Sequence, residues 1–270
     1  MNVITNSLRT KDNLTLFSRH WHSRKSPKAI VTIIHGLGEH SGRYQELASV
    51  LNNENIDVAS FDLRGHGKSD GPRGQISNYK TLLRDIGLFI KTVKSQKTPL
   101  FLYGHSFGGN LVINYILQEK DTDISGVISS SPWLKLTTEP QNNALSNKVK
   151  TLKSIVKPHL LTRNQEAIKK YKQDPLVHYD ISIRLYAAAR KSGLYALNST
   201  DNFYLPSLLM HGQADQITSW KATWKLKAKF GSSCTFKLWT DMFHELHNDL
   251  GKEKVWKYLI DWVCNTINLR

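Results

Sequence analysis

A short glycine-flanked turn in the middle of the chain constrains the fold more than any other feature. Residues 104–108 read Gly-His-Ser-Phe-Gly. They follow an apolar run at 99–103 and precede a pattern with helical spacing at 110–117. The two glycines let a helix pack close to a strand, where a Cβ would clash. The sequence therefore predicts a sharp strand-to-helix turn that raises the hydroxyl of Ser106 above a sheet, as in a nucleophile elbow. An ordinary glycine-rich turn with an exposed serine is the alternative that the five residues alone leave open.

Apolar runs of strand length alternate with helical patterns along most of the chain. The expected strands lie at 15–21, 29–34, 57–61, 100–103, 124–128, 205–210 and 235–239. The expected helices lie at 44–53, 79–93, 110–117, 219–230 and 255–267. This alternation predicts an α/β fold with a mostly parallel twisted sheet and helices on both faces. The 270 residues are enough for one such domain with a small insertion.

The alternation breaks once, between residues 133 and 203. This segment shows helical fragments at 152–161, 164–171 and 181–197 and no buried strand. It follows the carboxyl end of an expected strand, where open α/β sheets place their ligands. We therefore expect 133–203 to be a helical lid inserted into a hydrolase core formed by 1–132 and 204–270.

The formal net charge of +15 invites a nucleic-acid interpretation. However, the 37 lysines and arginines are spread over the whole chain, and no nucleic-acid-binding motif accompanies them. We therefore expect no nucleic-acid partner. Attraction to anionic surfaces such as phospholipid headgroups fits the charge better. The basic lid is the expected site of peripheral membrane contact, and its alternative is a solvated helix face.

Location is predicted from three features. No apolar run approaches the roughly 20 residues of a membrane-spanning helix. The first ten residues lack the pattern of a signal peptide. Cys234 and Cys264 lie far apart, match no metal-binding spacing, and are expected to be small apolar fillers. Together these features predict a cytoplasmic protein.

A serine hydroxyl becomes a good nucleophile when a histidine takes its proton and an acid orients the histidine. In this fold the acid and then the histidine follow the serine along the chain, each in a loop after a strand. Asp215 fits the acid, and His244 fits the base. Asp241 competes for the acid role, but it lies three residues before His244 and shares its strand. His247 is expected to cap the last helix or face solvent.

The oxyanion formed during acyl transfer needs fixed N–H donors. The backbone amide of Phe107, at a helix start, is one expected donor, and the amide of Leu37 in the Gly-rich loop 35–38 is the other. No metal or cofactor is predicted, since His35 and His40 lie in a glycine loop and no phosphate-binding loop is present. No site role is assigned to His20, His22, His159 and His178.

Five stretches, at 35–44, 61–74, 104–109, 211–215 and 243–245, together resemble the monoacylglycerol lipase and lysophospholipase branch of the α/β-hydrolases. The resemblance covers nearly the whole chain outside the expected lid, which matches no member. It implies an α/β-hydrolase fold with a lid over an acyl-binding tunnel. It also implies a catalytic triad of Ser106, Asp215 and His244. It implies an oxyanion hole at the backbone of Leu37 and Phe107, and a substrate contact at Arg43, near the glycerol end of the pocket. Residues 246–249 depart conservatively from the family pattern and leave the triad intact.

The expected function is that of a serine hydrolase that cleaves carboxylic esters of single-chain lipids, monoacylglycerol or lysophospholipid, through an acyl-enzyme. A short-acyl carboxylesterase, a thioesterase and a peptidase use the same triad and remain alternatives. A non-catalytic member that binds a small apolar ligand or partner is an alternative of another class.

Overall fold

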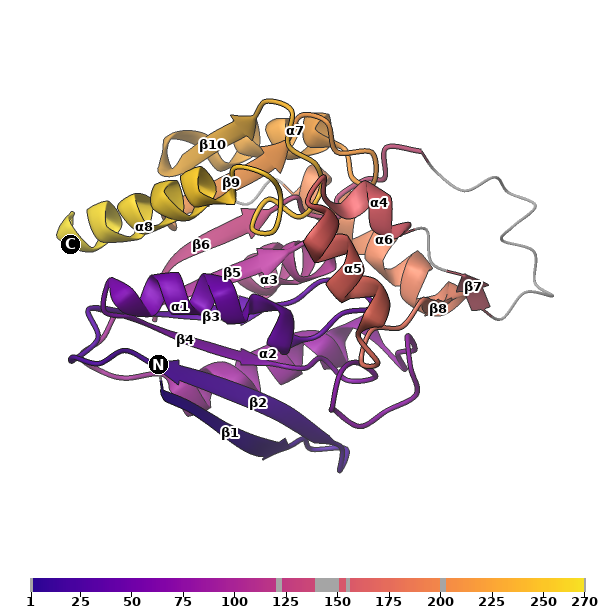
Figure 1. Cartoon of the computed structure of the whole chain (residues 1–270), viewed down its shortest axis with the longest axis horizontal. Coiled ribbons are helices and arrows are strands. Elements are labelled where there is room, and N and C mark those ends of the chain that lie inside the picture. The colour runs from indigo at the N-terminus through magenta and orange to yellow at the C-terminus, as the bar shows by residue number, and fades with distance from the viewer. Residues whose placement is uncertain (1, 120–122, 139–150, 154–155, 200–202, 270) are drawn as a thin grey trace.

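The computed structural model describes residues 2–119, 123–138, 151–153, 156–199 and 203–269. Eight strands form one sheet in the order β1-β2-β4-β3-β5-β6-β9-β10 (Figure 1). β1 pairs antiparallel with β2, β2 pairs antiparallel with β4, and all other neighbours are parallel. The predicted mostly parallel sheet is therefore confirmed. The strands are β1 (Asn2–Arg9), β2 (Thr15–His22), β3 (Ala29–Ile34), β4 (Ile56–Phe61), β5 (Leu100–His105), β6 (Ile124–Ser130), β9 (Ser207–Gly212) and β10 (Cys234–Trp239).

Helices cover both faces of the sheet, as expected. One apolar cluster joins one face to α2 (Tyr79–Val93) and α3 (Phe107–Gln118). A second cluster joins the other face to α1 (Gln45–Asn53) and α8 (Lys252–Asn268). A third smaller cluster includes residues of α7 (Trp220–Phe230). Within the described ranges, no helix is both long and apolar enough to cross a membrane.

Strand β1 was not predicted from the sequence. It pairs with β2 over its whole length, but most of its residues are exposed. An edge strand of this kind is held by backbone hydrogen bonds and carries no apolar alternation. The two cysteines are free thiols, with Cys234 buried and Cys264 half-buried against apolar residues, as predicted.

The described residues between β6 and β9 form three helices and a two-stranded sheet. The helices are α4 (Pro158–Leu161), α5 (Gln165–Gln173) and α6 (Ile183–Asn198). β7 (Thr151–Lys153) pairs with β8 (Asp180–Ser182), so the helix predicted over 152–161 is wrong in its first part. Pairing with β8 determines the strand conformation of these residues, and the local spacing of apolar residues does not indicate such pairing. Residues 139–150, 154–155 and 200–202 of the expected lid lie outside the described residues.

Backbone hydrogen bonds attach this segment to loops at the carboxyl edge of the sheet. The amide of His178 donates to the carbonyl of Gly38 at 2.9 Å, in the loop after β3. The amide of Glu245, in the loop after β10, donates to the carbonyl of Leu161 at 2.7 Å. The segment therefore lies over the edge where the predicted catalytic loops emerge, and Figure 1 shows α4 and α5 at this edge. Its assignment as a lid over 133–203 stays a prediction.

A buried ion pair fixes the loop after β4. Arg64 donates from Nε and Nη2 to the two carboxylate oxygens of Asp85 on α2, at 2.7 and 2.8 Å. Both side chains are almost fully buried, while Asp12, the second partner of Arg64, is half exposed. The pair with Asp85 therefore contributes most of the constraint on this loop.

We expect Arg64→Ala to lower the free energy of unfolding by about 3 kcal/mol or more, because it leaves Asp85 charged, buried and unpaired. Asp12→Ala is the matched control and should cost less than about 1 kcal/mol, since its ion pair is solvent-screened. Urea unfolding of the three proteins measures both values. Equal losses in the two variants would contradict this account of the loop.

Candidate active site

Ser106 occupies the turn between β5 and α3. Its backbone has φ 53° and ψ −114°, a conformation that is strained for any residue other than glycine. A Cβ placed on Gly104 would lie 2.3 Å from the carbonyl oxygen of Gly108, and one placed on Gly108 would lie 2.0 Å from that of Ile34. The predicted sharp turn is therefore confirmed, and it requires both glycines.

Asp215 and His244, predicted as acid and base, lie in the loops after β9 and β10 and are joined by a hydrogen bond. The distance between Asp215 Oδ2 and His244 Nδ1 is 2.7 Å. The Asp215 side chain is fully buried. Its Oδ1 accepts from the amides of Ile217 and Thr218, and its Oδ2 lies 3.0 Å from Nε2 of His211. These contacts hold the carboxylate in one orientation.

The pair shifts the pKa of each partner. Burial raises the pKa of Asp215, but the charges and hydrogen bonds of His244 and His211 outweigh it and hold this pKa well below its usual range. Burial lowers the pKa of His244, but the charge and hydrogen bond of Asp215 outweigh it and raise this pKa above its usual value. His244 is therefore more basic than an ordinary imidazole.

Ser106 and His244 line one narrow cavity, together with Leu37 and lid-segment residues such as Leu161. A Cβ placed on Gly36 would lie 3.4 Å from Cβ of Ser106, so the loop after β3 passes directly beside the serine. Within the described residues, the Ser106 hydroxyl makes no hydrogen bond to another protein group. The structure thus brings serine and histidine to one cavity without joining them directly.

The segments that carry the two predicted oxyanion donors lie next to Ser106. The amide of Phe107 is the first of α3, and Leu37 follows Gly36 in the loop after β3. In the part of the chain that the structure describes, neither amide donates to a protein acceptor. Gly36 donates its amide to Glu39 Oε1 at 2.6 Å, which fixes the conformation of this loop.

Arg43 lines the same cavity, and two carboxylates hold its guanidinium. Nη1 and Nη2 donate to the two oxygens of Glu245 at 2.7 and 2.8 Å, and Nη1 also donates to Glu39. Burial lowers the pKa of Arg43, but these carboxylates outweigh it and raise this pKa well above its usual value. Because Glu245 follows His244, the pair anchors the histidine loop. This anchor was not predicted from the sequence, and the substrate contact expected at Arg43 stays a prediction.

The prediction that His247 caps the last helix or faces solvent is wrong. His247 is 2% exposed, stacks on Tyr44 at 4.8 Å and meets the ring of His105 at 4.9 Å, so it neither faces solvent nor caps a helix. The last helix begins at Lys252, which leaves residues 245–251 free to turn back into the protein. Burial lowers the pKa of both His105 and His247 to about 3. Both rings are therefore neutral at pH 7.

Comparisons with known proteins show what the whole chain is similar to. A family model described as serine aminopeptidase S33, a hydrolase family, matches residues 25–251. An abhydrolase domain-containing protein from Dictyostelium discoideum is 36% identical over 99% of the chain, which spans 30% of that protein's length. Monoglyceride lipase from Rattus norvegicus is 31% identical over 95% of the chain and 89% of its own length.

Solved structures show the same fold. The crystal structure of monoacylglycerol lipase from Paleococcus ferrophilus superposes with a TM-score of 0.84 at 31% identity, covering 93% of this chain and 99% of that one. The predicted α/β-hydrolase fold is confirmed by this similarity, and so is the resemblance to the monoacylglycerol lipase branch.

We expect His244 to titrate above about 6.5, the usual value for histidine, and to titrate below it in Asp215→Asn, where burial is no longer opposed by a carboxylate. Asp241→Asn is the control, since Asp241 is exposed and makes no hydrogen bond to His244. Histidine ring signals followed by NMR against pH measure the pKa, with His244→Gln to assign the resonance. An unchanged pKa in Asp215→Asn would contradict the pairing.

Proposed function

Because this chain belongs to the hydrolase family described as serine aminopeptidase S33, we propose that it is a serine hydrolase that cleaves carboxylic esters of single-chain lipids, monoacylglycerol or lysophospholipid. The observation that carries the proposal is the buried 2.7 Å hydrogen bond between Asp215 and His244 beside the cavity that Ser106 lines. The relatives named monoglyceride lipase support the substrate class.

The proposed mechanism assigns one role to each group. Ser106 Oγ attacks the ester carbonyl carbon while His244 takes the hydroxyl proton. Asp215 stabilises the resulting imidazolium. The amides of Leu37 and Phe107 hold the negative oxygen of the tetrahedral intermediate. His244 then gives its proton to the leaving alcohol, and an acyl-enzyme remains on Ser106. Water, activated by the same histidine, attacks the acyl carbon and releases the fatty acid. Catalytic hydrogen bonds are often long in unliganded sites and tighten when substrate binds, which accommodates the missing contact between serine and histidine.

Arg43 is proposed to face the alcohol end of the substrate, since it lines the cavity beside Ser106. Its terminal nitrogens donate to Glu39 and Glu245, and its Cζ lies 4.6 Å from the centroid of the Tyr171 ring. The main role of Arg43 is therefore to anchor the loop that carries His244, and a contact with substrate would be an additional one.

A peptidase is the second candidate, because the matching family is described as an aminopeptidase. The same three side chains would attack an amide carbonyl, so the triad does not separate the two functions. The groups that would bind each substrate do separate them. The N-terminal amine of a peptide would need a free carboxylate near the cavity. Glu39 and Glu245 line the cavity, but both are bound to Arg43. This arrangement favours the ester substrate.

We expect Ser106→Ala to lower hydrolysis of a monoacylglycerol by about 10⁴-fold or more, because no other group can form the acyl-enzyme. Wild-type activity should rise with acyl length from butyryl to longer esters and should be absent on aminoacyl anilides. Initial rates on this series measure both, and near wild-type turnover by the alanine variant would refute the proposal. Asp241→Asn, a change in the discarded acid candidate, is the control and should keep full activity.

Peripheral contact with anionic membrane through the lid segment is a further part of the proposal. Three exposed lysines on α5, at positions 169, 170 and 172, support it. Exposed cations of this kind are each worth about 1 kcal/mol of attraction near an anionic leaflet. Such contact would bring the cavity below α4 and α5 close to lipid substrates.

Vesicle flotation tests the contact. We expect the wild type to float with phosphatidylserine vesicles at low salt and to remain unbound with neutral vesicles, because the attraction is electrostatic. Replacing Lys169, Lys170 and Lys172 by glutamate should abolish flotation. The matched control makes the same charge change on α7, at Lys221, Lys225 and Lys229, and should still float. Equal loss in both triple variants would show a general charge effect and contradict docking through α5.

A further inference from the structure

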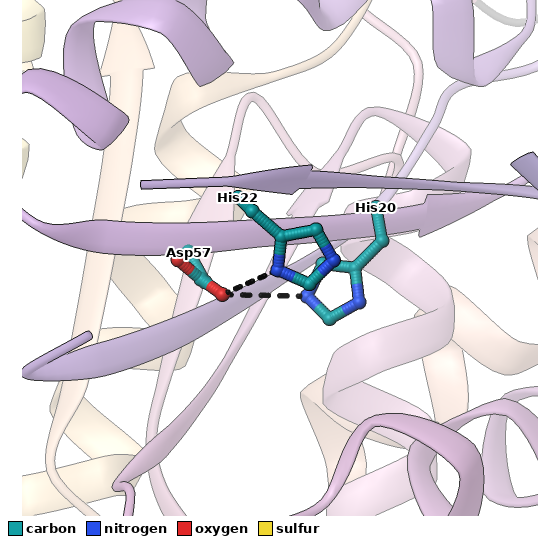
Figure 2. Close-up of side chains that lie close together, drawn as sticks. All are labelled: His20, His22 and Asp57. Atoms are coloured by element: carbon teal, nitrogen blue, oxygen red, sulfur yellow. Dashed lines mark hydrogen bonds and ion pairs between the residues drawn. The ribbon is translucent and has the colours of Figure 1, made fainter. Parts of the chain in front are cut away.

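Two histidines and an aspartate gather on the sheet far from the candidate active site. His20 and His22 are alternate residues of β2 and so project from the same face of the sheet. β2 pairs antiparallel with β4 up to Trp21 and Val58, and the next position along each strand places His22 beside Asp57. Figure 2 shows the two imidazoles and the carboxylate directed toward one point. Nothing in the proposed hydrolysis uses these side chains.

The three potential ligand atoms lie close together. His22 Nδ1 is 3.0 Å from Asp57 Oδ2, and His20 Nε2 is 3.8 Å from the same oxygen. All three atoms lie within 4.8 Å of one another. Two ligands of a tetrahedral zinc ion, each about 2.0–2.1 Å from the metal, are about 3.4 Å apart. The two distances to Asp57 Oδ2 fall on either side of that value, so side-chain rotation within this cluster could bring the three atoms around one ion.

His20 Nε2 is buried and has no hydrogen-bond partner among the residues that the structure describes. At 3.8 Å from Asp57 it is too far for a hydrogen bond but well placed to share a cation with it.

Ser23 holds the carboxylate in a ligating orientation. Its amide and its Oγ both donate to Asp57 Oδ1, at 2.8 and 2.6 Å. Oδ2 is thereby left directed toward the imidazoles. Outer hydrogen bonds of this kind orient metal ligands and commonly matter for affinity.

We propose that His20, His22 and Asp57 bind a zinc-type divalent cation that bridges β2 to β4. Two imidazoles and one carboxylate suit Zn²⁺, whereas Mg²⁺ and Ca²⁺ prefer oxygen ligands throughout. The imidazoles are 24% and 34% exposed, which gives the ion an entry path and leaves its fourth position to water.

The bound ion would fasten the N-terminal hairpin, which otherwise pairs with the rest of the sheet through four residues of β2. Asp57 lies at the beginning of β4, whereas Ser106 follows the end of β5, and both strands run parallel to β3. The two sites therefore lie at opposite edges of the sheet. Metal binding should change stability and leave the hydrolytic chemistry alone.

The test uses the full chain without a polyhistidine tag, freed of metal by a chelator. Titration calorimetry with Zn²⁺ should give one ion per chain, and Zn²⁺ at 100 times its Kd should raise the Tm by about 5 °C or more. His20→Ala and His22→Gln should each weaken binding about tenfold or more; the glutamine keeps a hydrogen-bonding group beside Asp57. His159→Ala removes an exposed histidine elsewhere and is the control, with wild-type affinity expected.

Two results would overturn the proposal. One is that the wild type does not bind zinc. The other is that the His20→Ala/His22→Gln double variant shows the same zinc affinity and the same rise in Tm as the wild type. Circular dichroism and ester hydrolysis check that each variant folds. If a variant fails that check, the Co²⁺ spectrum of the wild type decides. Tetrahedral bands without a thiolate charge-transfer band support the site, and a thiolate band would assign the metal to a cysteine instead.

Discussion

The close packing of α3 against β5 and β3 is the constraint on which the candidate site depends. It leaves no space for a side chain at Gly104 or Gly108, and the chain passes from strand to helix within one residue. Ser106 takes up the resulting strain, with its backbone at positive φ. The same turn starts α3 directly after Ser106, and the loop after β3 passes beside the serine. The proposed nucleophile and the proposed oxyanion donors therefore depend on the same close packing.

The sheet also positions His244, the proposed base. β9 and β10 are parallel neighbours, so the loops that follow them emerge at one edge. Asp215 and His244 can therefore meet although 29 residues separate them. The Arg43–Glu245 ion pair then ties the histidine loop to the chain beyond β3. A long-range ion pair therefore helps to hold the loop that carries His244.

Elements whose side chains are buried in a regular pattern could be predicted from the sequence. All six residues of β3 are buried, and α2 buries the predicted apolar face, with the bounds that its spacing indicates. The elbow and the Asp215–His244 pair could also be predicted, because motif and chain order mark them. The strands β1 and β7 could not be predicted, because they depend on pairing with other strands. The burial of His247 could not be predicted either, because it depends on contacts with Tyr44 and His105, which are distant in the sequence. The same holds for His20, His22 and Asp57, where alternate histidines on a strand were the single local signal.

The central claim is that Ser106 is an activated nucleophile. Treatment of the native protein with a fluorophosphonate, followed by mass spectrometry of the digested chain, tests it most directly. The account predicts one phosphonyl adduct, on Ser106, that forms rapidly in the wild type and slowly in His244→Gln. An unmodified Ser106, or an adduct that forms equally fast without the imidazole, would contradict it.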